Sequence, residues 1–300
     1  MTPPRAGTLV SRIAVFGTDN RQTLSTQRAP STDKIGTLAV KGSNICSAFC
    51  VSPDTIATAS HCLFGTAQSQ APTLTDLVFK IGEGPAASTS PLAGKSAAAI
   101  ERNIRAGTVS LRITPPIDAA NDWAVARLAQ PVCRSGGLPL SPLTREEVLV
   151  KSEAGAVYQI AMHRDFSPGT LALGGPCGMA ESFPLAGPDT IAHDFANAPS
   201  ILMHNCDTGA GSSGSPLLID GMHGPEVVGI NVGTYVLSRT SPSSSTGGGT
   251  EKSEPIANTA IATARFREVV EAFTFATSSL PTAARSRRSM KPPPGLPGTP

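Results

Sequence analysis

The sequence lacks the cysteine spacing of the commonest zinc and thioredoxin-type sites, because none of its cysteines forms a C-x-x-C pair. It also lacks any apolar run near the ~18 residues that a membrane-spanning helix needs. Charge of either sign is not in excess: 24 Lys and Arg against 22 Asp and Glu give a net charge of +2. Neither nucleic acid nor a membrane is therefore expected as a partner.

The cysteines are even in number, and disulfides are their expected use. They stand at positions 46, 50, 62, 133, 177 and 206. Disulfides persist in oxidising compartments, which predicts a secreted or periplasmic protein. The stretch Met1 to Gly7 contains no apolar segment of a secretory signal peptide, which conflicts with that prediction. A start codon chosen too far downstream, or a trimmed sequence, would reconcile the two, and the export route stays open.

The chain is rich in turn-forming residues, with 29 glycines and 27 prolines among 300 residues. That content favours many short strands over long helices. Short β-prone runs occur at 36–40, 46–51, 55–62, 75–81, 108–113, 123–128, 156–162, 200–204, 215–219, 227–232 and 256–262. The Pro-containing stretch 130–142 separates two halves, and 83–98 and 238–255 are expected to be surface loops. Apolar residues at helical spacing predict a closing helix over 262–273.

Ser213 lies in a stretch suited to present a nucleophile. Residues 206–218 are rich in small residues, and glycines at 211 and 214 flank Ser213. Glycine frees the backbone to expose its N–H groups, and such groups can bind the oxyanion that forms when a hydroxyl attacks a carbonyl. Taken alone, the stretch is equally typical of a flexible Gly/Ser loop.

A hydroxyl needs a base to become a nucleophile, and candidates lie upstream. His61 ends a β-prone run of small residues beside Cys62, which can fix its position. Asp122 directly precedes the apolar run 123–128. Each has a plainer interpretation: a lone histidine is more often structural, and a carboxylate before a strand is commonly a turn or capping residue. With Ser213, however, they supply a nucleophile, a base and an orienting carboxylate.

These stretches together resemble the chymotrypsin-like (trypsin-fold) serine peptidases, most closely their bacterial glutamyl-endopeptidase (V8-like) branch. The family's Thr-Ala-Ala-His-Cys appears here as Thr58-Ala59-Ser60-His61-Cys62, with Cys46 sixteen residues before Cys62. Its Gly-x-Ser-Gly-Ser-Pro appears as Gly211-Ser212-Ser213-Gly214-Ser215-Pro216. The order of His, Asp and Ser is also kept, and the resemblance covers roughly residues 13 to 274.

The resemblance implies an all-β fold of two packed six-stranded β-barrels with a C-terminal helix. The expected division is an N-terminal extension over 1–34, a first barrel over 35–135, a second barrel with the helix over 136–278, and a disordered tail over 279–300. The active site would lie in the cleft between the barrels.

The implied activity is that of a serine endopeptidase. His61 would take the proton of Ser213, Asp122 would orient His61, and the N–H groups of Gly211 and Ser213 would bind the oxyanion. Activity would fall on acidification as His61 protonates, with a midpoint roughly between pH 6 and 7.5. No metal or organic cofactor is implied, and the expected partner is a polypeptide substrate, bound by a monomer.

Ser212 departs from the best-known members, in which an aspartate at this place pairs with the α-amine released by zymogen cleavage. A serine cannot form that ion pair, so activation by this route is not expected. The resemblance also implies a Cys46–Cys62 disulfide beside His61 and a Cys177–Cys206 disulfide that anchors the nucleophile loop. A pairing of Cys50 with Cys133 follows by elimination only and is left open.

The expected pocket for the substrate side chain is formed by Asp207, Thr208 and Asn231, and its hints disagree. Asp207 falls where trypsin-like members carry an aspartate for Arg or Lys, whereas Thr208 falls where glutamate-cleaving members carry Ser or Thr. Asn231 stands where the latter carry histidine, and a neutral amide cannot supply charge to a carboxylate. We favour a basic or small polar residue. In the alternative, Asp207 makes a structural hydrogen bond and leaves a neutral pocket.

Two other functions are compatible with parts of the sequence. A non-catalytic homologue of the same fold would bind peptides without cleaving them. A metal-binding module would use Cys46, Cys50, His61 and Cys62, although C-x3-C followed by an adjacent His-Cys is poor spacing for a tetrahedral site.

Overall fold

The computed structural model of the protein describes residues 7–11, 13–24, 31–166, 169–241 and 250–278. The strands are β1 (Gly7–Val10), β2 (Gln22–Thr23), β3 (Ile35–Val40), β4 (Ser43–Ser52), β5 (Thr55–Thr58), β6 (Leu77–Ile81), β7 (Ser88–Pro91), β8 (Ile104–Ala106), β9 (Ala124–Arg127), β10 (Tyr158–Met162), β11 (Leu171–Gly174), β12 (Ile201–His204), β13 (Pro216–Gly221), β14 (Gly224–Ser241) and β15 (Thr250–Ala262). The helices are α1 (His61–Phe64), α2 (Ala97–Glu101), α3 (Arg145–Glu153), α4 (Pro188–Asp194) and α5 (Arg267–Ser278). No helix among the described residues is long and apolar enough to cross a membrane.

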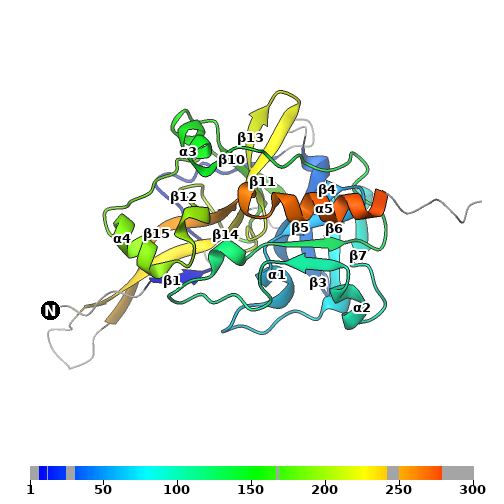
Figure 1. The fold of residues 1–300 in the computed structure, drawn as a ribbon, viewed down its shortest axis with the longest axis horizontal. Helices are drawn as coiled ribbons and strands as arrows, with labels where there is room; N and C mark the ends of the chain where they lie inside the picture. The colour runs from blue at the N-terminus through cyan, green and yellow to red at the C-terminus, as the bar shows by residue number, and fades with distance from the viewer. Residues whose placement is uncertain (1–6, 12, 25–30, 167–168, 242–249, 279–300) are drawn as a thin grey trace, which may run out of the picture.

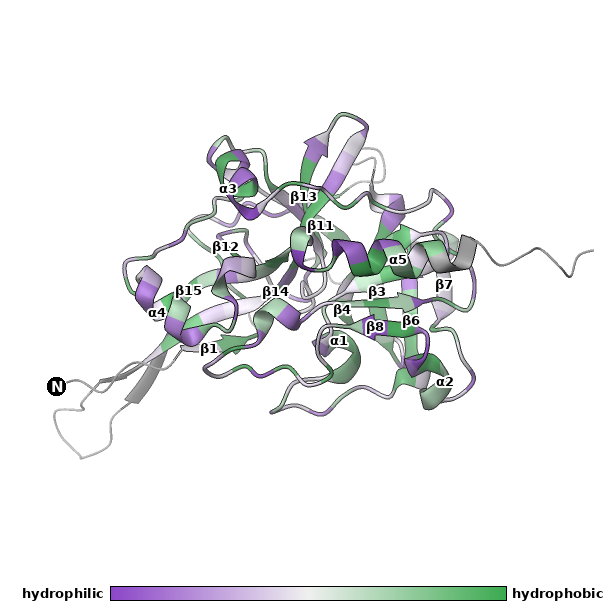
Figure 2. Ribbon diagram, viewed as in Figure 1, coloured by the Kyte–Doolittle hydropathy of each residue, from purple (hydrophilic) through white to green (hydrophobic). Residues whose placement is uncertain are grey.

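The first half of the chain forms a seven-stranded antiparallel sheet in the order β7-β6-β3-β4-β5-β9-β8 (Figure 1). A turn at Ser52-Pro53-Asp54-Thr55 joins β4 to β5, and the Asp54 carboxylate accepts hydrogen bonds from the hydroxyls of Ser52 and Thr55. Along this sheet Figure 2 shows many hydrophobic residues, and Leu38, Phe49 and Phe79 are fully buried. The sheet therefore supplies one side of a continuous apolar core.

The second half forms an eight-stranded antiparallel sheet in the order β12-β15-β14-β13-β10-β11-β2, to which β1 adds by pairing with β14. Its buried residues Ile160, Ile230 and Ile261 belong to the same apolar cluster as those of the first sheet. Helix α5 lies across the strands of the first sheet in Figure 1, and its Phe273 carbonyl accepts a hydrogen bond from Arg127 of β9 at 2.8 Å. The two halves are thus packed together, and the C-terminal helix closes over the first.

The architecture is the expected all-β one with two curled antiparallel sheets and a C-terminal helix, and that prediction is confirmed. The sheets have seven and eight strands instead of six each, because short strands such as β1, β2 and β8 add at their edges. The division into segments at 35, 136 and 279 stays a prediction. The expected disordered tail over 279–300 lies outside the described residues.

Three local predictions are wrong. Residues 83–98, expected to be a surface loop, include strand β7, in which Ser88 pairs with Ile81 of β6. Residues 108–113 form no ladder: Leu111 makes only an isolated bridge with Thr66, and the prolines at 115 and 116 directly after the segment have no N–H to donate. Residues 238–255, expected to be a loop, belong to strands at both ends, with Ser238 paired to Ser253. Backbone groups of a polar segment pair as well as those of an apolar one, so composition alone misplaces such a hairpin.

Candidate active site

His61 and Asp122 are brought together by the pairing of two strands. β5 and β9 run antiparallel with Thr58 opposite Ala124. The segment after β5, which carries His61, therefore lies beside the segment before β9, which carries Asp122. His61 Nδ1 lies 2.6 Å from Asp122 Oδ2, and the backbone N–H of His61 donates to Oδ1 at 2.8 Å. Asp122 has no exposed surface, and the Ser60 hydroxyl also donates to its Oδ1 at 2.8 Å. The carboxylate therefore fixes both the ring and the backbone of His61.

Asp122 also sets the protonation behaviour of His61. Burial alone would lower the pKa of the imidazole, but the charge of the Asp122 carboxylate and its hydrogen bond outweigh that effect. The net result is a His61 pKa above its usual 6.5. A base in this range is suited to accept a proton near neutral pH and to return it.

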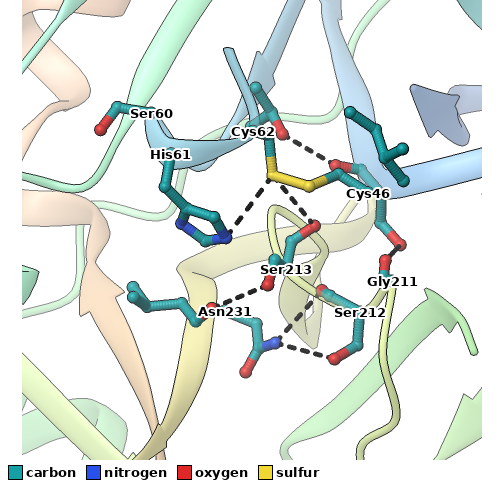
Figure 3. The surroundings of a disulfide bond; sticks show 12 residues. Cys46, Ser60, His61, Cys62, Gly211, Ser212, Ser213 and Asn231 are labelled. Carbon is teal, nitrogen blue, oxygen red and sulfur yellow. Dashed lines mark hydrogen bonds between the residues drawn. A yellow bond between two sulfur atoms is a disulfide. The ribbon is translucent and has the colours of Figure 1, made fainter. Parts of the chain in front are cut away.

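Ser213 lies in the loop between β12 and β13, next to the first sheet (Figure 3). Its carbonyl accepts a hydrogen bond from the Ser47 N–H of β4 at 2.8 Å. Its Oγ donates to the Val232 carbonyl at 2.9 Å, and among the described contacts no hydrogen bond joins it to His61. His61 Nε2 instead lies 3.9 Å from Cys62 Sγ. The structure thus brings His61 and Asp122 into contact and leaves the hydroxyl turned toward Val232.

The expected oxyanion donors are aimed by the carbonyls that precede them. In a trans peptide the C=O and N–H point in opposite directions. The Ala210 carbonyl accepts the Arg164 N–H at 2.9 Å, which turns the Gly211 N–H the other way, and Gly211 has a φ of 100° that favours glycine. The Ser212 carbonyl accepts hydrogen bonds from Asn231 Nδ2 and from the Ser215 N–H, both at 3.1 Å. The Ser213 N–H is therefore also turned away from these donors. Neither the Gly211 N–H nor the Ser213 N–H donates to a backbone carbonyl within the described residues.

Ser47 is a residue of this site that the sequence did not reveal. Its side chain is fully buried, its Oγ donates to the Gly211 carbonyl at 2.9 Å, and the same Oγ accepts the Met162 N–H at 3.0 Å. Its carbonyl accepts the Thr58 hydroxyl at 2.8 Å. Ser47 therefore joins the first sheet, the second sheet and the nucleophile loop. Its place directly after Cys46 was the only sequence signal that could have pointed to it.

All six cysteines are paired in disulfides. They join Cys46 to Cys62, Cys50 to Cys133 and Cys177 to Cys206, the pairs considered from the sequence. The first ties β4 to the helix that carries His61 (Figure 3). The last ends at Cys206, just before the nucleophile loop. Ligand atoms of Cys46, His61 and Cys62 do lie within 4.8 Å of one another. The expected zinc ligands are thiolates, however, and sulfurs joined in disulfides are not thiolates.

The expected pocket residues Asp207 and Thr208 lie beneath an N-terminal segment. Asp207 Oδ1 accepts the Phe16 N–H and Oδ2 accepts the Asn20 N–H, both at 2.9 Å. The backbone of Thr208 pairs with that of Ala14. Asp207 is only 1% exposed, so both of its oxygens serve structural hydrogen bonds. This arrangement corrects the expectation that Asp207 faces a substrate cation and agrees with the alternative of a structural role.

Asn231, expected in the wall of the same pocket, is also directed elsewhere. Its side chain is buried, its Nδ2 donates to the carbonyl and hydroxyl oxygens of Ser212 at 3.1 and 3.2 Å, and its Oδ1 lies 3.1 Å from His204 Nε2. The amide is therefore part of the support of the nucleophile loop.

An open cavity of about 330 Å³ adjoins His61. Its other lining residues include Val232 and Gly233 of β14 and the apolar Leu9 and Ile113. The N-terminal strand β1 borders it, because Leu9 donates its N–H to the Ile113 carbonyl at 2.9 Å while β1 pairs with β14. A ligand in this cavity would lie between the two sheets and beside the imidazole.

Comparisons with known proteins address the fold and the family of the chain. No curated protein sequence matches the chain. Among solved structures, a chain described as a Glu endopeptidase in complex with MPD is 17% identical; the likeness covers 89% of this chain and 100% of that one, with a TM-score of 0.55. That likeness shows the chymotrypsin-like fold. Residues 46–230, which carry His61, Asp122 and Ser213, match the family described as the trypsin-like peptidase domain, and the chain belongs to that family.

Proposed function

We propose that the protein is a serine endopeptidase that cleaves polypeptides with His61, Asp122 and Ser213. The observation that carries the proposal is the 2.6 Å contact of His61 Nδ1 with the buried Asp122, beside a loop with two outward-turned N–H groups. A carboxylate in this position holds the imidazole with its proton on Nδ1, so that Nε2 is free to accept one.

In the proposed mechanism, Ser213 Oγ attacks the peptide carbonyl while its proton passes to His61 Nε2. The negative charge that develops on the carbonyl oxygen is bound by the N–H groups of Gly211 and Ser213. His61 then gives the proton to the leaving amine, and the C–N bond breaks to leave an ester on Ser213. Water, deprotonated by His61, attacks the ester; the bond from Ser213 Oγ to the acyl carbon breaks, the acid leaves, and His61 returns the proton to Oγ. Asp122 stabilises the imidazolium at both stages.

One observation favours the alternative of a non-catalytic peptide-binding protein. Ser213 Oγ donates to Val232 rather than to His61. Rotation about the single χ1 torsion of Ser213 reorients the hydroxyl, and catalytic hydrogen bonds often tighten only when substrate is bound. The complete set of base, orienting carboxylate and N–H donors supports the catalytic proposal over this alternative.

Labelling with a fluorophosphonate tests both. The wild type should incorporate one label on Ser213 and hydrolyse a protein substrate, and Ser213→Ala should lose both while keeping its melting temperature. Ser212→Ala and Ser215→Ala are the matched controls, because they remove neighbouring hydroxyls and should keep the label. Label that persists in Ser213→Ala would contradict the assignment of the nucleophile. A folded wild type that is neither labelled nor active would support the non-catalytic alternative.

For the residue before the scissile bond, we propose a preference that does not depend on the charge of Asp207. Its two oxygens are held by the N–H groups of Phe16 and Asn20, so they are not available to a substrate cation. This favours a neutral pocket over the basic preference that the sequence indicated. Cleavage of a peptide library with all residues at this position measures the preference directly; a strong selection for Arg or Lys would contradict a neutral pocket.

We also propose that the protein works in an oxidising compartment, outside the cytoplasm, since all three cysteine pairs form disulfides. Thiol titration of the protein from its native source, denatured without reductant, should find no free thiol.

A further inference from the structure

A chain of buried polar groups stands behind the nucleophile loop. Asn231 links Ser212 on one side to His204 of β12 on the other, and Figure 3 shows its amide nitrogen facing both oxygens of Ser212. His204 has no exposed surface, Asn231 is 1% exposed and Ser212 is 5% exposed. Polar groups buried to this degree have defined partners, and here the partners are one another.

The direction of each hydrogen bond in this chain follows from chemistry. The Ser212 carbonyl can only accept, so the NH2 end of the Asn231 amide must face it. Asn231 Oδ1 then faces His204, and an oxygen can only accept, so His204 Nε2 must carry a proton and donate. His204 Nδ1 is buried and makes no hydrogen bond of normal geometry within the described part of the chain, although the Thr259 backbone lies close enough to favour a protonated ring. Burial lowers the pKa of His204 to about 4, so the ring is neutral at neutral pH.

This chain acts on one of the two proposed oxyanion donors. The Ser212 carbonyl and the Ser213 N–H belong to the same trans peptide and point in opposite directions. The carbonyl accepts two hydrogen bonds, from Asn231 Nδ2 at 3.1 Å and from the Ser215 N–H at 3.1 Å. Asn231 supplies the side-chain half of the hold that fixes the direction of the Ser213 N–H. The backbone of Asn231 holds the next residues too, since its carbonyl accepts the Gly214 N–H at 2.8 Å and its N–H donates to the Ser215 carbonyl at 2.9 Å. One residue thus fixes the loop on both sides of Ser213.

We infer that Asn231 and His204 are positioning residues that preset the oxyanion-binding N–H of Ser213, with His204 acting only through Asn231. The inference rests on the proposed function, because it concerns the same site. It also addresses the serine at position 212: a neutral amide inside the protein anchors this peptide where the best-known relatives use an aspartate and a new α-amine. The anchor is built into the chain and needs no terminal amine.

Four variants test the inference: Asn231→Ala, His204→Leu, His204→Gln and the double variant His204→Leu/Asn231→Ala. We expect Asn231→Ala to lower kcat about 100-fold with KM changed less than threefold, because the oxyanion forms only in the transition state. His204→Leu should lower kcat about tenfold by freeing the Asn231 amide to turn. His204→Gln should recover most of that loss, since its side-chain NH2 can still donate to Oδ1. In the double variant, the loss should equal that of Asn231→Ala alone.

Two further readouts separate positioning from unfolding. The final amount of fluorophosphonate bound per protein counts intact Ser213 sites and should stay at one, whereas the rate of labelling should fall with kcat. Affinity for a peptide aldehyde, whose adduct carries the oxyanion, should fall by the same factor as kcat. Thr263→Val is the matched control: it removes a buried hydroxyl that donates to the Ser141 and Val228 carbonyls at 3.1 and 3.4 Å, and it does not touch the loop. It should leave kcat unchanged.

The outcomes distinguish this inference from the proposed function. A wild type without label or turnover contradicts the proposed function itself. An active wild type whose kcat and aldehyde affinity survive Asn231→Ala overturns the inference and leaves the proposed function standing. Independent, multiplicative losses from His204→Leu and Asn231→Ala overturn the claim that His204 acts through Asn231. If the variants lower only the final amount of bound fluorophosphonate, and Thr263→Val lowers it equally, the role of these residues is purely structural. That result overturns the inference as well.

Discussion

Replacing Ser47 by alanine should separate the stability of the protein from the geometry of its nucleophile loop. The hydroxyl is fully buried, donates to the Gly211 carbonyl at 2.9 Å and accepts the Met162 N–H at 3.0 Å. Ser47→Ala removes one oxygen and leaves both partners facing a methyl group. Each buried polar group left without a partner costs about 1–3 kcal/mol, so with two such groups the expected loss in the free energy of unfolding is about 2–6 kcal/mol.

The same change should lower activity, because the Gly211 carbonyl lies between the two peptides that carry the proposed oxyanion donors. Loss of its anchor lets these peptides rotate, and a misplacement of about 1 Å at a reacting centre can cost about 100-fold in rate. We expect kcat of Ser47→Ala to fall about 10- to 100-fold, measured on a chromogenic peptide at a temperature at which the variant is fully folded. KM should change much less, since the ground-state contacts of the substrate persist.

Ser90→Ala is a matched control within the same sheet. Ser90 is also fully buried, its Oγ donates to the Pro91 carbonyl at 3.0 Å, and it accepts the Gln130 N–H at 3.0 Å. The Pro91 carbonyl also accepts the Ala129 N–H, so the stability loss should be at the lower end of the same range. Its kcat should be that of the wild type. Equal losses of kcat in both variants, or an unchanged kcat in Ser47→Ala, would refute the reasoning.

Three further results are expected. Asp122→Asn should lower kcat about 10³- to 10⁴-fold and move the acid limb of the pH–rate profile to lower pH: His61 works when neutral, its raised pKa depends on the Asp122 charge, and burial alone lowers it. An unmoved limb would show that another group titrates there. Replacing both Cys177 and Cys206 by alanine should lower the free energy of unfolding by about 3–4 kcal/mol, since their sequence separation of 29 defines the loop that the bond closes, as measured by thermal unfolding. Asp207→Ser should leave substrate preference in the peptide library unchanged and reduce stability; a changed preference would return Asp207 to the pocket.

The fold was predictable where the sequence carries local signals. The turn Ser52-Pro53-Asp54-Thr55 between two β-prone runs predicted the β4–β5 hairpin, and the structure confirms it. The α3 helix was missed although Thr144 and Glu147 form a capping box, in which each side chain bonds the backbone of the other residue. That S/T-x-x-E pattern was available in the sequence. The β-prone run at 55–62 ends in a helical turn from His61, a boundary that propensity alone does not define.

The candidate site was predictable only in its motif residues. His61, Asp122 and Ser213 sit in recognisable short patterns, whereas Ser60 and Ser47 matter through contacts that depend on the packing of separate strands. Ser47 meets Gly211 across a sequence separation of 164 residues. The residues next to Ser47 or Gly211 in the sequence do not predict this hydrogen bond, because it forms only when one sheet packs on the other.

The contacts of the expected pocket residues were also not predictable from the sequence. Counting back from Ser213 places Asp207, and the histidine position of the glutamate-cleaving members places Asn231. Neither match says which polar group each side chain contacts. Asp207 accepts hydrogen bonds from backbone N–H groups 187 and 191 residues away in the sequence. Asn231 donates to Ser212 of the nucleophile loop, 19 residues away. A buried carboxylate or amide forms hydrogen bonds with the polar groups that the fold places beside it, since leaving it unpaired costs several kcal/mol. Side-chain identity at a matched position therefore predicts a donor or an acceptor, and only the assembled fold decides whether the substrate or the protein uses it.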